Sequence, residues 1–345
     1  RRIIPEGAGT AISDAVENGE VSLARVTEIE DEIRHDVMAV VRALAEQSKE
    51  GGQYVHFGAT SNDIIDTATA LQIRDSIPYL REGVARTGMA LAALAKKHQN
   101  TPMLGRTHGQ WAVPMTFGLK MAVYAAEIHR HYQRLVEITP RICAGKMMGA
   151  VGTGAAMGDF ALEIQQELMD ELGLTGEIAS SQLVGRDRYV ELISWCASVC
   201  ASLEKFATEV RNLQRPEIGE VSEHFDLNKQ VGSSTMAQKR NPITSENICG
   251  LSRIVRSFVL PTYENVISWH ERDLCNSSAA RFSLSHSLIL TDDVLIKTAQ
   301  LFEGLHVHEK RMLENLERSG GEIMAESVMM ALARKGMGLS LIHIS

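Results

Sequence analysis

The feature that most constrains the fold is a long apolar stripe at helical spacing. Between Tyr189 and Leu213 an apolar side chain recurs every three or four residues, and neither Pro nor Gly interrupts the run. Such a stripe predicts one helix that, at ~1.5 Å per residue, is roughly 37 Å long. Its apolar positions are Tyr189, Leu192, Ile193, Cys196, Val199, Cys200, Leu203, Phe206, Val210 and Leu213.

Two further segments carry the same kind of periodicity. The first runs from Phe117 to Ile138 and the second from Leu284 to Phe302. Long helices with a heptad-like stripe are typical of helix bundles. Aromatic residues make up only 5% of the chain, whereas 15 residues are Met. This composition favours aliphatic helix packing over a β-sandwich. No alternating strand pattern is found, so the sequence predicts an all-α fold built on a long-helix bundle.

Charge and hydropathy exclude several classes of partner. The net charge is −8 and no run of Lys or Arg occurs, so the sequence predicts no nucleic-acid binding and no membrane-surface binding. No apolar stretch reaches the ~18 residues that a membrane span needs. If the substrate is anionic, individual arginines must therefore hold it.

The five cysteines show no spacing that is typical of a metal site, so we expect no metal. Cys196 and Cys200 lie four residues apart on one face of a predicted helix, which favours core thiols. Unpaired core thiols fit a reducing cytoplasm. The remaining cysteines are Cys143, Cys249 and Cys275.

Polar and titratable side chains are concentrated in four short segments of an otherwise aliphatic helical chain. Loops held between rigid helices are common sites of binding and catalysis. Two segments also have simpler interpretations, because residues 60–63 could cap a helix and residues 232–234 could be a linker. The segments are Ile33-Arg34-His35-Asp36-Val37, His56-Phe57-Gly58-Ala59-Thr60-Ser61-Asn62-Asp63, Gly105-Arg106-Thr107-His108-Gly109-Gln110, and residues 232–242 followed by Glu246.

Together these segments resemble the fumarase/aspartase superfamily over nearly the whole chain. The superfamily signature, Gly-Ser-Ser-x-Met-Pro-x-Lys-x-Asn-Pro, is matched from Gly232 to Pro242, except that Ala237 stands in place of the first proline. Alanine lacks the fixed φ of proline and adds a backbone donor. Within the superfamily, residues 56–63, 105–110, 182–189 and 269–278 are similar to the adenylosuccinate lyase family.

The resemblance implies a helical protein of three domains, of which this chain holds two. Residues 1–76 would form a partial, small helical N-terminal domain, and residues 77–338 the central long-helix bundle. The third domain would follow Gly338 and is expected to be absent. Residues 339–345 are expected to be non-native read-through, so we expect a chain truncated at both ends.

The resemblance also implies a β-elimination that releases fumarate from adenylosuccinate, leaving AMP, and from the succinyl-carboxamide ribonucleotide of purine synthesis. Such a reaction needs a base, donors for a dianionic carboxylate and an acid for the leaving nitrogen. By resemblance, Ser233 is the base and Lys239 the neighbouring cation. His108 is the general acid, an imidazole role suited to neutral pH, and Glu246 pairs with it. His56 is a supporting histidine.

A further set of side chains matches positions that contact substrate in the family. His35 is expected near the nucleotide, and Arg272, Ser277 and Arg281 match the phosphate-binding set, because a guanidinium suits a phosphate dianion. A surface salt bridge is the simpler interpretation of Arg272. The resemblance implies no cofactor. The expected substrate contacts are His35, Asp36, Thr60, Ser61, Thr107, Gln182, Ser234, Asn241, Arg272, Ser277 and Arg281.

The partners implied by the resemblance are a small-molecule nucleotide substrate and further copies of the same chain. We expect a homotetramer whose active sites combine residues from three subunits. The stripe from Tyr189 to Leu213 is expected to be buried between those subunits. The stretch from about Lys229 to Arg240 is expected to close over the substrate.

Three other interpretations remain open. A 3-carboxymuconate cycloisomerase shares a Gly-Ala-Thr-Ser-x-Asp segment but resembles Gly-Arg-Thr-Trp where this chain has His108. Argininosuccinate lyase resembles Ser-Arg-Asn-Asp in place of residues 60–63. A non-catalytic structural homologue could lack the base or the acid, whereas this chain retains Ser233, Lys239 and His108.

Overall fold

A computed structural model describes residues 3–19, 21–225, 235–236 and 238–338. The described residues are mainly helical, as the sequence predicts, and they belong to two compact units. None of the helices in these ranges combines the length and the apolar character that a membrane span requires. The first unit comprises Arg1–Asp75, Thr139–Tyr189 and Glu264–Ser278, and the second comprises Ser76–Ile138, Val190–Tyr263 and Ala279–Ser345.

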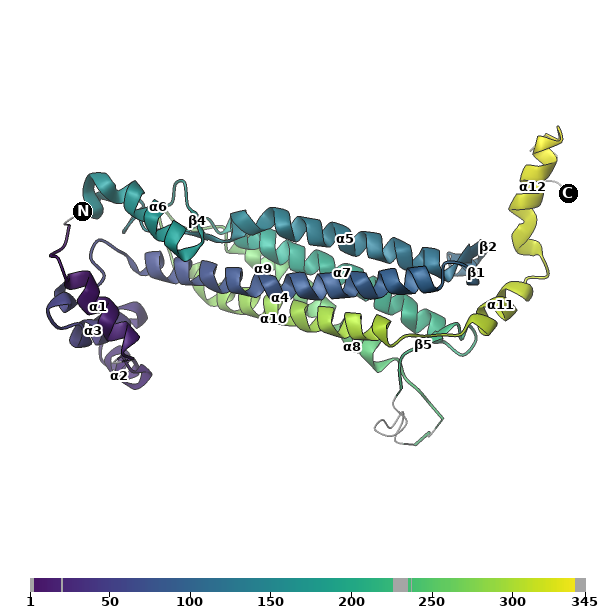
Figure 1. Cartoon of the computed structure of the whole chain (residues 1–345), viewed down its shortest axis with the longest axis horizontal. Coiled ribbons are helices and arrows are strands. Elements are labelled where there is room, and N and C mark those ends of the chain that lie inside the picture. Colours follow the sequence, from purple (N-terminus) through teal and green to yellow (C-terminus); the bar gives the residue numbers. More distant parts are fainter. Residues whose placement is uncertain (1–2, 20, 226–234, 237, 339–345) are drawn as a thin grey trace. The chain divides into compact units, whose positions relative to one another are not determined.

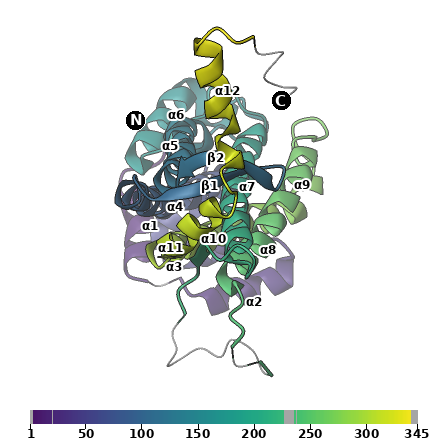
Figure 2. The same cartoon turned by 90° about the vertical axis from the view of Figure 1, so that its right-hand side faces the viewer.

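The larger parts of four long helices lie in the second unit, where they run side by side (Figures 1 and 2). Three of them confirm the periodic segments of the sequence. The four helices are α4 (Ser61–Lys97), α5 (Phe117–Ile142), α7 (Asp187–Gln214) and α10 (Cys275–Glu303).

The apolar stripe of α7 is buried inside the bundle of its own chain. Leu203 and Phe206 are both 0% exposed. The ring of Phe206 stacks on Tyr124 of α5 with 4.1 Å between centroids, and it meets Phe302 of α10 edge-on at 6.5 Å. The expectation that this stripe is buried between subunits is therefore wrong, because α5 and α10 already cover it.

The longest helix, α4, is not one that the periodicity predicted. Its 37 residues give it a length of about 55 Å. Pro78 lies in its interior, and the helix packs on two sides, because Arg81 donates to Tyr132 of α5 and Arg86 pairs with Glu303 of α10. Packing on two sides distributes apolar residues around the helix, which obscures a single stripe. The domain boundary expected after residue 76 falls inside this helix.

Shorter helices complete both units. In the first unit, Ile29 and the alanines Ala39 and Ala43 form a small core between two of them. The shorter α-helices are α1 (Ala8–Glu17), α2 (Leu23–Ile33), α3 (Asp36–Gln47), α6 (Ala161–Leu172), α8 (Ile243–Ser257), α9 (Val259–Glu264), α11 (Glu309–Glu317) and α12 (Ala325–Arg334). The 3-10 helices are η1 (Lys49–Tyr54), η2 (Ala155–Phe160) and η3 (Glu322–Met324).

Strands are few, but one pair was not anticipated by the sequence. An antiparallel hairpin joins β1 (Pro102–Thr107) to β2 (Gln110–Thr116), inside a segment that we expected to be a loop between helices. Two more pairs involve two residues per strand: β3 (Ala144–Gly145) runs parallel to β4 (Thr175–Gly176), and β5 (Val221–Ser222) antiparallel to β6 (His306–Val307).

Candidate active site

The expected general acid lies at the tip of the β1–β2 hairpin. Thr107 pairs with Gln110, which leaves His108 and Gly109 as a two-residue turn. Both turn residues have positive φ, 55° at His108 and 74° at Gly109, as a type I′ hairpin turn requires. His108 and Thr107 are solvent-exposed in the single chain. The turn therefore presents an imidazole and a hydroxyl at one accessible point.

A buried carboxylate holds the arm of this hairpin. Arg106 lies two residues before His108 and donates to both oxygens of Glu220, at 2.9 and 2.7 Å. Asn315 donates to the same carboxylate at 2.9 Å, and Glu220 is 0% exposed. Bidentate pairs of this kind fix orientation as well as adding energy. Sequence reasoning named Arg106 within its segment but missed Glu220, which lies more than a hundred residues further along.

A second carboxylate fixes the start of α8. Glu223 accepts from the backbone N–H groups of Thr244 at 3.1 Å and Ser245 at 2.7 Å. Pro242 precedes α8 and forms no side-chain cap, so Glu223 satisfies the free donors of the first turn. The stretch between Glu223 and Thr244 thus has its two ends joined. Sequence reasoning missed Glu223 as well, since its own neighbours give no sign of this contact.

The expected catalytic loop lies between these joined ends. Ser233 and Ser234, the expected base and its neighbour, lie outside the described residues, as does Ala237. Lys239 is exposed, and Asn241 is half-buried just before α8. Most of the stretch expected to close over substrate therefore has no structural description.

Glu246 lies in the first turn of α8 and is exposed. His108 and Glu246 both belong to the described part of the chain, and no ion pair joins them there. Their pairing stays a prediction, and in an oligomer it can be tested between different copies.

The start of α4 carries the next group of expected contacts. Thr60 immediately precedes the helix, and its N–H donates to the carboxylate of Asp63 at 2.8 Å, as in a capping box. Within residues 60–63 the capping interpretation is thus confirmed for Asp63. It leaves the hydroxyls of Thr60 and Ser61 as partly exposed groups at the helix N-terminus. Asp63 itself was not among the expected site residues.

Two expected histidines lie near each other in the first unit. His35 caps α3 by accepting from Met38 N–H at 3.3 Å, and Asp36 is the first residue of that helix. His56 is half-buried, with φ at 70°. Burial lowers the pKa of His56 below its ordinary value; Asp63 opposes this shift and His35 adds to it. His56 is therefore a neutral imidazole near pH 7, able to donate from one nitrogen and accept at the other.

Gln182 and Arg272, two expected substrate contacts, are brought together. The guanidinium of Arg272 donates to the side-chain oxygen of Gln182 at 2.6 Å, and Gln182 donates to Ala150 O at 2.8 Å. Among the described residues Arg272 forms this hydrogen bond and not the surface salt bridge of the simpler interpretation. Ser277 lies in the first turn of α10, and Arg281, which is exposed, lies further along that helix in the second unit.

Comparison with known proteins finds a match to the family described as Lyase over residues 7–256. The adenylosuccinate lyase of Methanothermobacter thermautotrophicus is 48% identical over 337 residues, which are 97% of this chain and 75% of that protein. The adenylosuccinate lyase of Aquifex aeolicus is 41% identical over 334 residues, 97% of this chain and 76% of that protein.

Solved structures give the same picture of the fold. A fumarate lyase from Mesorhizobium sp. BNC1 is similar with a TM-score of 0.89 at 35% identity, covering 99% of this chain and 76% of that one. A 3-carboxy-cis,cis-muconate lactonizing enzyme from Pseudomonas putida is similar with a TM-score of 0.87 at 31% identity, with the same two coverages, 99% and 76%.

Proposed function

The chain belongs to the Lyase family, and on that premise we propose that its reaction is the elimination of fumarate from adenylosuccinate, which leaves AMP. The observation that carries the proposal is the 48% identity to an adenylosuccinate lyase along 97% of the chain. The presence of His108 in the hairpin turn agrees with it. We extend the proposal to the succinyl-carboxamide ribonucleotide, so that the enzyme would act in purine biosynthesis.

The proposed chemistry divides among the named side chains. Ser233 removes the proton beside a carboxylate, and Lys239 stabilises both the serine alkoxide and the dianion that forms. Asn241 and Thr107 donate hydrogen bonds to that dianion. His108 protonates the leaving nitrogen.

A separate group of side chains would hold the substrate. Arg272, Ser277 and Arg281 are proposed to bind the phosphate, and Gln182 keeps Arg272 in place through the 2.6 Å hydrogen bond. The hydroxyls of Thr60 and Ser61 lie at the N-terminus of α4, where anionic groups are favoured. His35, Asp36 and Ser234 complete the proposed contacts.

We propose a homotetramer with shared sites, in which expected site residues stand both at the start of α4 and in the hairpin that follows it. Ser61 is the first residue of this helix of about 55 Å. Backbone hydrogen bonds from Phe117 to Thr101 and from Gly118 to His98 hold the base of the hairpin at the last turn of the same helix. In the proposed tetramer, Ser61 and His108 act in sites that other copies of the chain complete.

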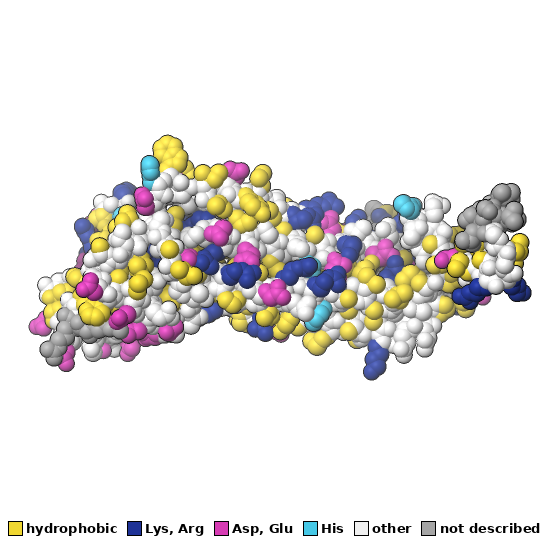
Figure 3. Space-filling view, turned by 90° about the horizontal axis from the view of Figure 1, so that it is seen from above, with side chains coloured by type: hydrophobic (Ala, Val, Ile, Leu, Met, Phe, Trp, Pro, Cys, Tyr) yellow, Lys and Arg dark blue, Asp and Glu magenta, His cyan; other side chains and the backbone are white. Residues whose placement is uncertain are grey.

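Exposed apolar side chains on the long helices favour the same oligomer. On α5, Leu119, Val123 and Val136 are 55%, 53% and 45% exposed, and on α10 Ile289 is 67% exposed. Figure 3 shows many such side chains between the charged ones on one face of the chain. Large apolar groups left in water by a single chain are typical of subunit interfaces.

We propose the cytoplasm as the compartment. All five cysteines lie in described segments and are free thiols, four of them buried. Thiols that stay reduced fit a reducing compartment.

The test is to incubate the purified protein with adenylosuccinate and to identify fumarate and AMP by chromatography. The same preparation is given 3-carboxy-cis,cis-muconate, because the second structural relative acts as a lactonizing enzyme. Release of fumarate from adenylosuccinate alone supports the proposal. Turnover of the muconate alone would assign the chain to the cycloisomerase class instead.

A further inference from the structure

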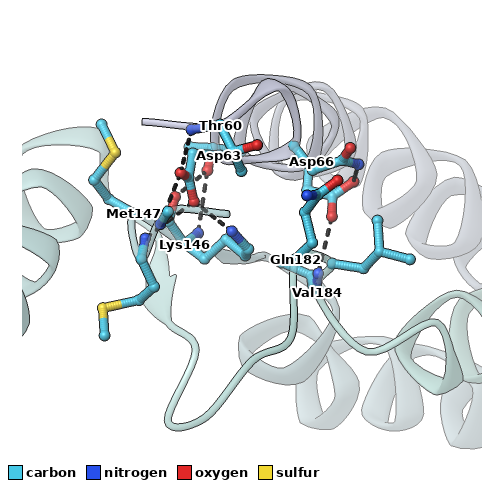
Figure 4. Close-up of polar contacts among 12 residues, drawn as sticks. Thr60, Asp63, Asp66, Lys146, Met147, Gln182 and Val184 are labelled. Carbon is cyan, nitrogen blue, oxygen red and sulfur yellow. Dashed lines mark hydrogen bonds and ion pairs between the residues drawn. The ribbon is translucent and has the colours of Figure 1, made fainter. Parts of the chain in front are cut away.

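We infer that Asp63 and Lys146 form a buried positioning pair that fixes the substrate-binding side chains of the first unit. The inference rests on the proposed function for the identity of those side chains. Both members of the pair have side chains that are 0% exposed, and the ammonium of Lys146 contacts one carboxylate oxygen of Asp63 directly. Figure 4 shows this pair and the contacts around it.

Asp63 accepts four hydrogen bonds, and three of them come from backbone N–H groups. One oxygen accepts from Lys146 Nζ and from Met148 N–H at 3.0 Å. The other accepts from Thr60 N–H at 2.8 Å and from Gly149 N–H at 3.0 Å. A single carboxylate thus connects Thr60, the residue before α4, to the loop that follows β3.

The loop reached by Asp63 leads directly to two more expected substrate contacts. Ala150, the residue after Gly149, accepts a hydrogen bond from Gln182, which in turn accepts from Arg272. The continuous path runs from Thr60 through Asp63 and the loop to Gln182 and Arg272. All of these residues belong to the first unit.

The backbone of the loop depends on this anchor. Gly149 has φ at 75°, and a Cβ built there would lie 3.2 Å from the carbonyl oxygen of Gly58. The loop is therefore packed closely against the segment that carries His56. Lys146 is held at its own backbone too, because its N–H donates to Thr67 Oγ1 at 3.1 Å and its carbonyl accepts from that hydroxyl at 3.0 Å.

A fully buried ion pair is weak support for overall stability, because the cost of removing two charges from water offsets their mutual attraction. A hydrophobic pair of similar volume would fill the same space. What the carboxylate adds is a set of directed acceptors that hold Thr60 and Gly149 in register. Such placement matters for the reaction, since a misplacement of about 1 Å can lower the rate by ~10²-fold.

The experiment compares Asp63→Asn with the double variant Asp63→Asn/Lys146→Met. In Asp63→Asn an amide nitrogen replaces one acceptor oxygen, so two of the four donors lose their partner. In the double variant Met removes the Lys146 donor, and the amide still leaves at least one of the three backbone N–H groups without its acceptor. We expect KM for adenylosuccinate to rise about 10–100-fold with a smaller fall in kcat, because the displaced groups bind the ground state as well as the transition state. The double variant also removes the buried cation, so it should keep a melting temperature near that of the wild type.

Glu204→Gln is the matched control. Glu204 of α7 is a largely buried carboxylate that pairs with Arg253 and Arg256 of α8, and it has no proposed role in binding. Its substitution should leave KM unchanged. A KM for the double variant within about twofold of the wild-type KM would overturn the inference, because substrate binding would then not depend on the carboxylate of Asp63.

Amide hydrogen exchange separates this inference from the proposed function. In the double variant, exchange should accelerate in residues 58–61 and 147–151 and stay unchanged in α7. Unchanged exchange in those two segments would overturn the positioning role even if KM rose. If the wild-type protein does not cleave adenylosuccinate, the proposed function fails while the exchange result still decides the positioning role.

Discussion

At the scale of single residues, the position of His108 makes it a clean target for substitution. The side chain is exposed at the tip of a two-residue turn, so its removal leaves no buried cavity. His108→Ala should therefore keep the fold and the oligomer while turnover falls by ~10²–10⁴-fold, the usual contribution of a general acid. Steady-state kinetics measures the fall in turnover, and size-exclusion chromatography checks that the oligomer is kept. Near-normal turnover would move the acid role to another residue, His56 first.

Ser233 is the second residue whose role is decided by kinetics. If it is the base, Ser233→Ala should bind adenylosuccinate almost normally but turn it over very slowly, because the group acts mainly in the transition state. Lys239→Met should impair binding as well, since its charge also meets the ground-state carboxylate. Wild-type turnover by Ser233→Ala would exclude this base, and Ser234 would be the next candidate.

At the scale of elements, the β1–β2 hairpin is sensitive at Gly109. A Cβ at this position meets no atom within 4 Å, so the cost of a side chain comes only from its φ of 74°. Gly109→Ala should cost about 1–2 kcal/mol at the turn and lower kcat/KM by displacing His108. Gly109→Asn is the matched variant, because Asn adopts the left-handed region more readily. Equal kcat/KM for the two variants would show that turn strain does not reach the imidazole.

The contact between α5 and α7 contains a buried histidine that makes the bundle sensitive to acid. His131 is 2% exposed, and its Nε2 lies 2.9 Å from the hydroxyl of Ser202, which donates to Glu127. Ser202 therefore accepts a hydrogen bond from His131, whose neutral ring carries its proton on Nε2. The Nδ1 of the same ring lies 3.5 Å from the guanidinium of Arg134. Burial, and then Arg134, lower the pKa of His131 from 6.5 to about 4.

The sign of the resulting pH dependence follows from proton binding. Between pH 6.5 and about 4 the unfolded chain binds a proton at His131 and the folded chain does not, so stability is lost as pH falls through this window. The loss is on the order of 3 kcal/mol. Urea unfolding at fixed protein concentration should show a shallower acid loss for His131→Gln than for the wild type. If the free energy of unfolding fell equally with pH in the two proteins, His131 would not be the origin of the acid sensitivity.

At the scale of the whole molecule, shared sites predict complementation between inactive variants. In a random 1:1 mixture of His108→Ala and Ser233→Ala subunits, a site that takes the two residues from different chains has both intact in roughly a quarter of cases. We therefore expect activity to return after mixing under conditions of subunit exchange. Exchange demonstrated by mass, with no recovery of activity, would exclude shared sites.

The sequence alone determined the class of the molecule and the segments that carry its chemistry. Helical periodicity predicted α5, α7 and α10, because apolar residues at three-to-four spacing are a local property of the chain. The signature from Gly232 to Pro242 and its companion segments indicated the family. Residues that contact substrate directly stand in short motifs, so a sequence displays them without a fold.

Only the tertiary structure decided where the supporting groups act. The long-range contacts of the supporting carboxylates carry no local signal, since Arg106 lies 114 residues from Glu220, Lys146 lies 83 from Asp63, and Thr244 lies 21 from Glu223. Packing also decided that the α7 stripe is buried by its own chain. It likewise decided that His108 lies in the turn of a hairpin. For the carboxylates the physical reason is the same: a buried carboxylate must find donors to offset its lost hydration, and the fold rather than the neighbouring sequence supplies them.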